Sequence, residues 1–164
     1  MSSLTKRQIA EIVVGSLNSN VESHGNLADN PFVLKVKGLV PLAVFGFTVT
    51  APPGGRHRSE LKIQLIAPGQ KRGEPGSFVA PPGHWPVLLG FSENYNVFVL
   101  WDARKHVDFA WSKNCQVKMQ ALTDAQITGH GTATRNLRGG VTETILTARP
   151  DHLLEVLGTR VTTA

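Results

Sequence analysis

The feature that most constrains the fold is a pair of apolar runs separated by a short polar turn. Residues 87–91 and 97–102 flank the five residues 92–96, an arrangement typical of an antiparallel hairpin. The second run begins Val-Phe-Val-Leu-Trp, so its first five positions are all apolar. A strand carries apolar side chains on both sides where both faces of its sheet are covered. The sequence therefore predicts a central strand here, with packed layers on each side.

Capping patterns and apolar spacing predict three helices. Thr5 and Gln8 have the spacing of a capping box, in which the two side chains each bond a backbone N–H at the start of the helix. Apolar residues then recur on one helical face up to Leu17, so we expect a helix over 5–17. Shorter helices are expected over 122–129, where the capping pattern recurs, and over 150–158, which opens on a proline.

Alternating and apolar runs predict the remaining strands. They cover residues 32–37, 43–50, 60–66 and 142–148, with a short extended run at 109–111. The segments 18–30 and 130–140 are polar and turn-rich, so we expect loops there. Few helical crossovers separate the strands, which favours antiparallel pairing. We therefore predict a single α+β domain over residues 1–164, with a twisted, largely antiparallel sheet, an N-terminal helix, a short internal helix and a C-terminal helix.

The charge and the cysteine content narrow the functional classes. The chain has 17 Lys and Arg residues against 12 Asp and Glu, a formal net charge of +5 that favours an anionic partner such as nucleic acid. Its single cysteine, Cys115, excludes a disulfide framework and a zinc site built on several thiolates, and we interpret it as a small packed residue. No apolar run approaches the ~18 residues of a membrane-spanning helix, and the N-terminus has no signal-peptide pattern. We therefore expect a cytoplasmic protein without a membrane partner.

A basic stretch, residues 54–84, has the composition expected of a DNA-contacting loop. Between residues 54 and 72 it holds five Lys and Arg residues and one acid. Arginine offers a planar fork suited to phosphate or guanine, and lysine offers a mobile point charge. The candidate DNA-binding residues in this stretch are Arg56, His57, Arg58, Lys71, Arg72 and His84. The alternative is a solvated loop with scattered cations.

An apolar, proline-rich run lies in the second half of the same stretch. Its residues Phe78, Ala80, Pro81 and Pro82 are candidates for a shallow apolar contact surface. Such a surface loses little conformational entropy on binding because proline fixes its backbone in advance. The alternative is a stiff connector.

A third candidate group follows the predicted central strand. Arg104, Lys105 and His106 come directly after it, and Lys113 and Asn114 follow a few residues later. Side chains at the end of a strand that the core holds in place are well positioned to contact a ligand. Polar residues are also commonplace after a strand, so ordinary surface charge is the alternative.

Other chemistry is less well supported by the sequence. Asp29, Glu60 and Lys62 match the bare pattern of a Mg²⁺-dependent nuclease, although a charged pair two residues apart is frequent by chance. The histidines show no metal-ligand spacing, and no nucleotide-binding glycine loop or Ser–His–acid arrangement is present. We therefore predict no catalytic residue, no metal and no cofactor for this chain.

Three stretches of the chain, RSELKIQL, PVLLGFSENYNVFVLWDARKHVDFAWSKNCQVK and ETILTARPDHLLEVL, resemble a known family. They look like the DNA-reading domain in front of HNH nucleases of the McrA type, which are modification-dependent restriction enzymes. Within that group the chain is most similar to the sulfur-binding domain that recognises phosphorothioate-modified DNA. The resemblance runs from about residue 56 to 157. It implies that double-stranded DNA is the partner and that an HNH nuclease domain, absent from this chain, completes the full-length protein.

The resemblance also implies roles for particular residues. In the family, a proline ring and an aromatic neighbour receive the sulfur, while a His-Arg pair and further arginines hold the DNA backbone. His57-Arg58 matches that pair, and Arg104 is the choice for the later arginine. Phe78 with Pro81 or Pro82 would form the sulfur pocket, although the family's aromatic residue is a tyrosine. Lys71 and Arg72 would form a basic loop over this pocket.

Elementary chemistry is consistent with such a pocket. Sulfur is larger, more polarisable and less strongly hydrated than the phosphate oxygen that it replaces, so an apolar cavity favours it. Cations alone cannot discriminate, because both linkages carry the same charge. A methylcytosine reader remains an alternative, with an extruded base held by one of the tryptophans Trp85, Trp101 or Trp111.

Overall fold

The computed structural model describes residues 3–51 and 59–162, which form one main sheet, a small second sheet and three α-helices. Arg56, His57 and Arg58 lie outside the described residues, so their predicted DNA contacts stay predictions.

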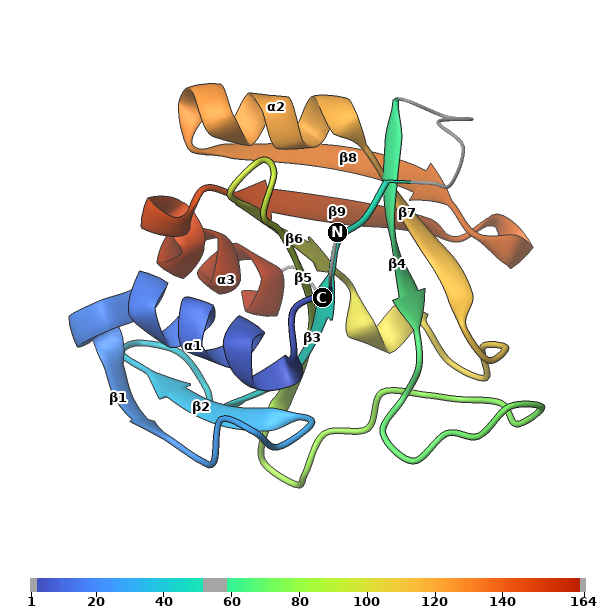
Figure 1. Cartoon of the computed structure of the whole chain (residues 1–164), viewed down its shortest axis with the longest axis horizontal. Coiled ribbons are helices and arrows are strands. Elements are labelled where there is room, and N and C mark those ends of the chain that lie inside the picture. Colours follow the sequence, from blue (N-terminus) through green and yellow to red (C-terminus); the bar gives the residue numbers. More distant parts are fainter. Residues whose placement is uncertain (1–2, 52–58, 163–164) are drawn as a thin grey trace.

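The main sheet has seven strands in the order β1-β2-β3-β5-β6-β9-β8 (Figure 1). They are β1 (Val21–His24), β2 (Phe32–Val36), β3 (Leu42–Thr48), β5 (Trp85–Ser92), β6 (Val97–Trp101), β9 (Thr142–Ala148) and β8 (His130–Asn136). Every neighbouring pair is antiparallel except β3 and β5, which run parallel. A separate antiparallel pair consists of β4 (Glu60–Leu65) and β7 (Lys113–Lys118). The predicted α+β fold with a largely antiparallel sheet is confirmed.

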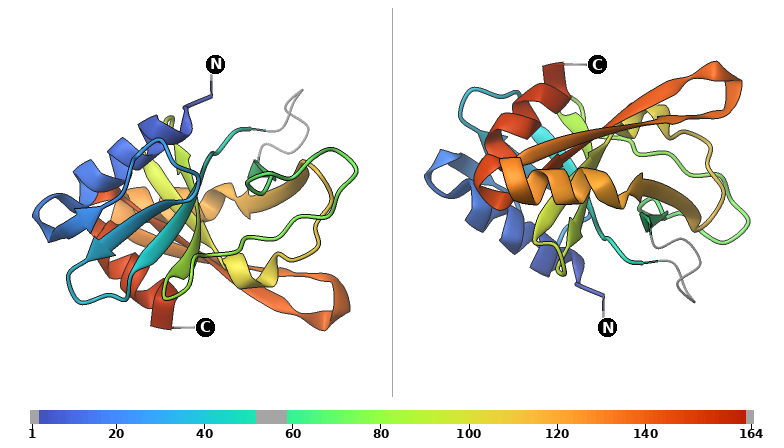
Figure 2. Two further views of the ribbon diagram at one scale, coloured as in Figure 1. Left: turned by 90° about the horizontal axis from the view of Figure 1, so that it is seen from below. Right: turned by 90° about the horizontal axis from the view of Figure 1, so that it is seen from above.

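Both faces of the main sheet are covered, as the apolar run in β6 predicts. The helices α1 (Lys6–Leu17) and α3 (Leu153–Thr162) pack on one face, and α2 (Met119–Thr128) and the β4–β7 pair pack on the other (Figures 1 and 2). Phe98 and Leu100 of β6 belong to the first core, and Val97, Val99 and Trp101 belong to the second. The central strand is therefore buried along its whole length.

The N-terminal helix begins at the predicted capping box. The Thr5 hydroxyl accepts a hydrogen bond from the Gln8 N–H at 3.1 Å, and the Gln8 side chain accepts one from the Thr5 N–H at 2.8 Å. These two bonds satisfy backbone donors that the first helical turn leaves free. The buried face of α1 carries Ile9, Val13 and Leu17, so its predicted packing on the body is confirmed.

The structure has three strands where the sequence analysis expected none. β1 lies in the predicted loop 18–30 and β8 in the predicted loop 130–140. Both are edge strands without a fully buried residue, so they lack the apolar alternation that identifies a strand. β7 was also missed, because only Cys115 and Val117 are buried among its six residues.

Two helices differ from their predicted limits. α2 begins at Met119, and the Thr123 hydroxyl donates to the Met119 carbonyl from inside the helix, so Thr123 is no cap. The C-terminal helical region begins with a 3-10 turn at Pro150, and α3 continues past the predicted end at Gly158 to Thr162. Among the helices of the described chain, none combines the length and apolar composition that crossing a bilayer would require.

Candidate functional site

A short 3-10 turn, η3 (Ala103–Lys105), carries the polar cluster that follows the central strand. The Asp102 carboxylate caps this turn by accepting a hydrogen bond from the Arg104 N–H at 3.1 Å. The cap fixes the backbone that carries Arg104, Lys105 and His106, and these three side chains point in different directions. The Arg104 guanidinium lies 4.6 Å from the ring centroid of Trp85, and the Lys105 ammonium donates to the Thr142 carbonyl at 2.7 Å.

The third side chain, His106, points inward and is 4 % exposed. This differs from the prediction that His106 contacts DNA, because a buried ring cannot reach a phosphate. The position remains close to solvent, however, since His106 forms part of the wall of a surface cleft.

This cleft has a volume of about 530 Å³ and is edged by cations. Lys105 and Lys113 both line it, and both are exposed. The structure thus brings together Lys105, His106 and Lys113 from the third predicted group. Asn114 is exposed on β7 but is not part of the lining, because successive residues of a strand point to opposite faces. Asp108 contributes one acidic group to the same lining.

The loop that carries Lys71 and Arg72 is attached to one wall of this cleft. Gly76 and Phe109 exchange two backbone hydrogen bonds of 2.9 Å, and the Asp108 N–H donates to the Ser77 hydroxyl at 3.0 Å. The loop of residues 66–84 therefore runs beside the segment of residues 106–112 (Figures 1 and 2). Lys71 and Arg72 are both exposed on it.

The predicted apolar pocket residues are split between the core and the surface. The Phe78 ring packs in the second core, with its centroid 5.0 Å from those of Phe45 and Phe109, and it is only 6 % exposed. This differs from the predicted role, because the ring fills the core instead of lining an open pocket. Pro81 and Pro82 are exposed, and Ala80 is partly buried. The Phe78 side chain therefore anchors a run whose prolines remain at the surface.

His84 belongs to a different surface region. It lines a separate depression together with His24 and Lys35, near β1 and β2. The structure therefore does not combine His84 with the lysines of the cleft.

The residues proposed for a nuclease are not brought together. The turn that contains Asp29 precedes β2 at the lower part of Figure 1, whereas Glu60 opens β4 at the upper part. Lys62 is 9 % exposed. A carboxylate pair must lie within a few ångströms to share Mg²⁺, so this arrangement does not provide that site.

The three tryptophans proposed for a methylcytosine pocket have different surroundings. Trp101 is fully buried and donates its indole N–H to the Gln116 carbonyl at 3.1 Å. Trp85 packs against the first core and is covered by Arg104. Trp111 is partly buried in a turn. Trp101 therefore cannot hold an extruded base.

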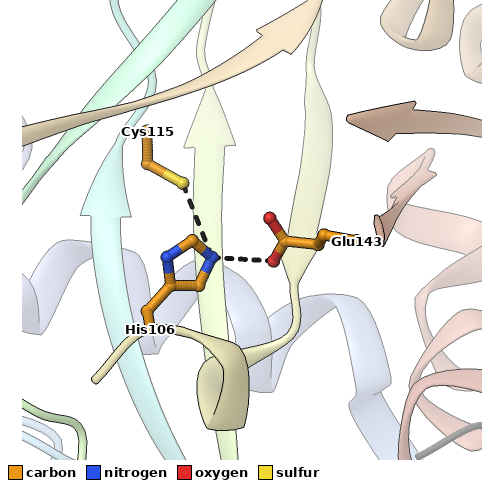
Figure 3. A group of neighbouring side chains, drawn as sticks. All are labelled: His106, Cys115 and Glu143. Carbon is orange, nitrogen blue, oxygen red and sulfur yellow. Dashed lines mark hydrogen bonds and ion pairs between the residues drawn. The ribbon is translucent and has the colours of Figure 1, made fainter. Parts of the chain in front are cut away.

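Behind the cleft lies a buried cluster of three side chains, His106, Cys115 and Glu143 (Figure 3). His106 Nε2 lies 2.7 Å from Glu143 Oε2 and 3.9 Å from Cys115 Sγ. Glu143 Oε2 also accepts a hydrogen bond from the Asp102 N–H at 2.9 Å. Cys115 is 1 % and Glu143 0 % exposed, which confirms that the cysteine is a packed residue.

The geometry of this cluster does not suit a cysteine nucleophile. In a nucleophilic triad the histidine contacts the thiol with one ring nitrogen and the acid with the other. Here both partners contact Nε2 (Figure 3). Burial, with a further contribution from the negative charge of Glu143, raises the pKa of the Cys115 thiol to about 12. The free thiol is therefore protonated at neutral pH and does not serve as a nucleophile.

Sequence reasoning missed this cluster because its members come from three distant segments. His106 follows η3, Cys115 lies on β7 and Glu143 lies on β9. The available signal was a glutamate in the same alternating register as Ile145 and Thr147, which face the second core. A charged residue at an inward strand position is rarely buried without partners.

Comparison with known proteins identifies the family. A family model described as methylase-associated X1 matches residues 41–157, which include the cleft residues and the whole buried cluster. No curated protein and no solved structure matches the chain. The family match covers well over half of the 164 residues. The chain therefore belongs to the methylase-associated X1 family.

Proposed function

We propose that this chain is a non-catalytic DNA-binding domain that directs a restriction–modification system to its target. The observation that carries the proposal is the cleft flanked by Lys105 and Lys113, with the basic loop of Lys71 and Arg72 attached to its wall. The family's association with methylases supports a role on DNA. In this proposal an HNH nuclease domain of the full-length protein, as the McrA-type resemblance implies, performs the cleavage.

The arrangement of cations suits a DNA backbone. Lysine side chains bind phosphates as point charges and release condensed counterions, which gives affinity without sequence preference. The Lys105 ammonium uses one of its three donors on the Thr142 carbonyl, so two donors remain for a phosphate. That bond also holds the side chain in place before binding, which reduces the entropy lost in the complex.

The finer part of the proposal concerns the modification. We propose that the surface run of Val79, Pro81 and Pro82 provides the apolar contact that prefers a phosphorothioate sulfur. Val79 is 76 % exposed and both prolines are exposed, while the buried Phe78 ring anchors the run beside Phe109. Apolar atoms near the DNA backbone favour sulfur over the more strongly hydrated oxygen.

Fluorescence anisotropy with a labelled duplex tests the DNA-binding proposal. The variant Lys105→Ala/Lys113→Ala should bind the duplex at least about tenfold more weakly than the wild type. The slope of log K against the logarithm of the salt concentration should become smaller in magnitude by about two, because two phosphate contacts are lost. The matched control is Arg7→Ala/Lys37→Ala, which removes two exposed cations from α1 and the end of β2. Equal losses in both variants, or no binding by the wild type, would contradict the proposal.

A comparison of two duplexes tests the preference for sulfur. Phosphorothioate and unmodified duplexes of one sequence should bind with different affinities in the wild type. Replacing Pro81 and Pro82 by serine should reduce this difference and leave the affinity for unmodified DNA unchanged, because the positive charges remain. If the wild type binds the two duplexes with equal affinity, the proposed preference for sulfur is wrong, whereas the proposal of DNA binding is unaffected.

A further inference from the structure

The buried cluster contains a polar atom that the fold leaves without a partner. Glu143 is fully buried, and its Oε1 has no hydrogen-bond partner among the described residues. Its other oxygen, Oε2, receives both His106 Nε2 and the Asp102 N–H. A buried carboxylate oxygen without a partner is costly, so its presence calls for a function or a missing ligand.

The Glu143 carboxylate lies beside two other groups whose atoms bind transition metals. His106 Nε2, Cys115 Sγ and a carboxylate oxygen of Glu143 all lie within 4.8 Å of one another (Figure 3). From these contacts we propose that His106, Cys115 and Glu143 form a binding site for one divalent transition-metal ion, with Zn²⁺ the best match. Imidazole nitrogen, thiolate sulfur and carboxylate oxygen are the ligand types found at protein zinc sites.

The three ligand atoms lie near the separations of a tetrahedral site. With Zn–N and Zn–O of about 2.0–2.1 Å and Zn–S of about 2.3 Å, tetrahedral ligands stand roughly 3.3–3.6 Å apart. His106 Nε2 now lies 3.9 Å from the sulfur and 2.7 Å from Glu143 Oε2. The sulfur contact must therefore shorten and the carboxylate contact lengthen, each by about half an ångström. The third separation, from Cys115 Sγ to a Glu143 oxygen, is at most 4.8 Å and must shorten to about 3.6 Å. Side-chain torsions can absorb such shifts without moving the strands.

The charges of the site also balance on binding. A divalent cation is neutralised by the Cys115 thiolate and the Glu143 carboxylate, with His106 neutral. The thiol proton and the proton on His106 Nε2 must leave these atoms as the metal bonds form; the first goes to solvent, and the second moves to Nδ1 or to solvent. The second ring nitrogen of His106 points away from Glu143 (Figure 3), and the residue lines the cleft. The cluster therefore adjoins the cleft through His106.

Two arginines define the competing explanation, a metal-free structural cluster. Arg135 Nη1 lies 3.9 Å from Cys115 Sγ, and the buried Arg160 lies close enough for the charge of Glu143 to affect its pKa. In this explanation the two cations offset the negative charge of the cluster without a metal. Oε1 stays unpartnered, however, and Arg160 donates its described hydrogen bonds to the carbonyls of Leu100 and Thr144.

Metal binding would link segments of the chain that adjoin the cleft. The three ligands come from the segment after η3, from β7 and from β9, which lie far apart in sequence. One ion would tie these segments together directly behind Lys105 and Lys113. The site stands independently of the proposed DNA-binding function, because metal binding is measured without DNA.

The test uses the chain without an affinity tag, freed of metal by a chelator and titrated with Zn²⁺ or Co²⁺. The wild type should bind one ion per chain and gain thermal stability with either metal. Bound Co²⁺ should show the near-ultraviolet charge-transfer absorption of a cobalt–thiolate bond. Absence of binding, or of any thermal shift, would overturn the proposal.

Two ligand variants and one control identify the site. Cys115→Ser should lose the charge-transfer absorption, and Glu143→Gln should bind Co²⁺ at least about tenfold more weakly, since even supporting residues contribute that much. Val117→Ala removes a buried β7 side chain that is no ligand, so it should keep both signals. If Cys115→Ser does not fold, Glu143→Gln still tests the site. Co²⁺ binding by Glu143→Gln that equals binding by the wild type would contradict the assignment of Glu143 as a ligand.

Discussion

At the scale of single residues, Lys6 shows how burial can outweigh two favourable contacts. Its ammonium donates to the Gly46 carbonyl and lies 3.8 Å from the ring centroid of Phe47. Both contacts favour the charged form. Burial nevertheless lowers the pKa of Lys6 from 10.5 to about 8, so the loss of hydration is the larger effect. The folded protein therefore carries a destabilising charge at this position at neutral pH.

The variant Lys6→Met tests this balance through the pH dependence of stability. Between pH 8 and 10.5 the unfolded chain keeps the Lys6 proton and the folded chain loses it, so the wild type should gain stability relative to the variant as the pH rises through this window. The gain should be at most about 1.4 kcal/mol per pH unit. Urea unfolding of both proteins at several pH values measures the difference, in which other titrating groups cancel. A constant difference across the window would show that the Lys6 pKa is normal.

At the scale of elements, the same capping pattern marks the start of one helix and the interior of another. The capping box at Thr5 starts a helix, whereas the same pattern at Thr123 lies inside one, because α2 already begins at Met119. The strands of the central sheet were predictable because burial on both faces imposes an apolar sequence. The edge strands were not, because β8 keeps alternate residues exposed and contains a glycine. Tertiary contacts, which a local pattern does not contain, decided these cases.

Gly131 of β8 illustrates such a contact and gives a prediction. A Cβ there would lie 2.5 Å from the Ala121 carbonyl oxygen of α2, so the close packing of α2 on β8 requires glycine. Gly131→Ala should therefore destabilise the protein by about 1–3 kcal/mol. Gly158→Ala is the matched comparison, because its Cβ would meet only Leu39, at 3.8 Å, inside α3. It should stabilise by about 0.5–1 kcal/mol, since alanine favours helix. Urea unfolding distinguishes the two, and a neutral Gly131→Ala would contradict the packing argument.

At the scale of the whole molecule, the candidate site exists only after folding. Three of the five residues that the sequence grouped after the core strand, Lys105, His106 and Lys113, line one cleft, because the end of a core strand is recognisable locally. The sequence could not show that His106 turns inward, since Glu143 lies on another strand 37 residues away. Likewise, the rings of Phe45 and Phe109 that enclose Phe78 come from separate segments. Which side chains face a ligand thus depends on pairings between distant segments.

This assembled surface predicts a footprint for DNA. Hydrogen–deuterium exchange should slow on DNA binding in the segment of residues 104–113 and in the loop of residues 69–77, because backbone bonds between Gly76 and Phe109 join them into one wall. If Arg56, His57 and Arg58 bind DNA as the sequence predicts, the peptide that contains them should be protected as well. α1 and β2 should exchange unchanged, since neither contributes a residue to the cleft and both lie at the left of Figure 1, away from β7. Protection concentrated around β1 and β2, near His24 and His84, would instead place the interface at the second depression and remove the cleft from the mechanism.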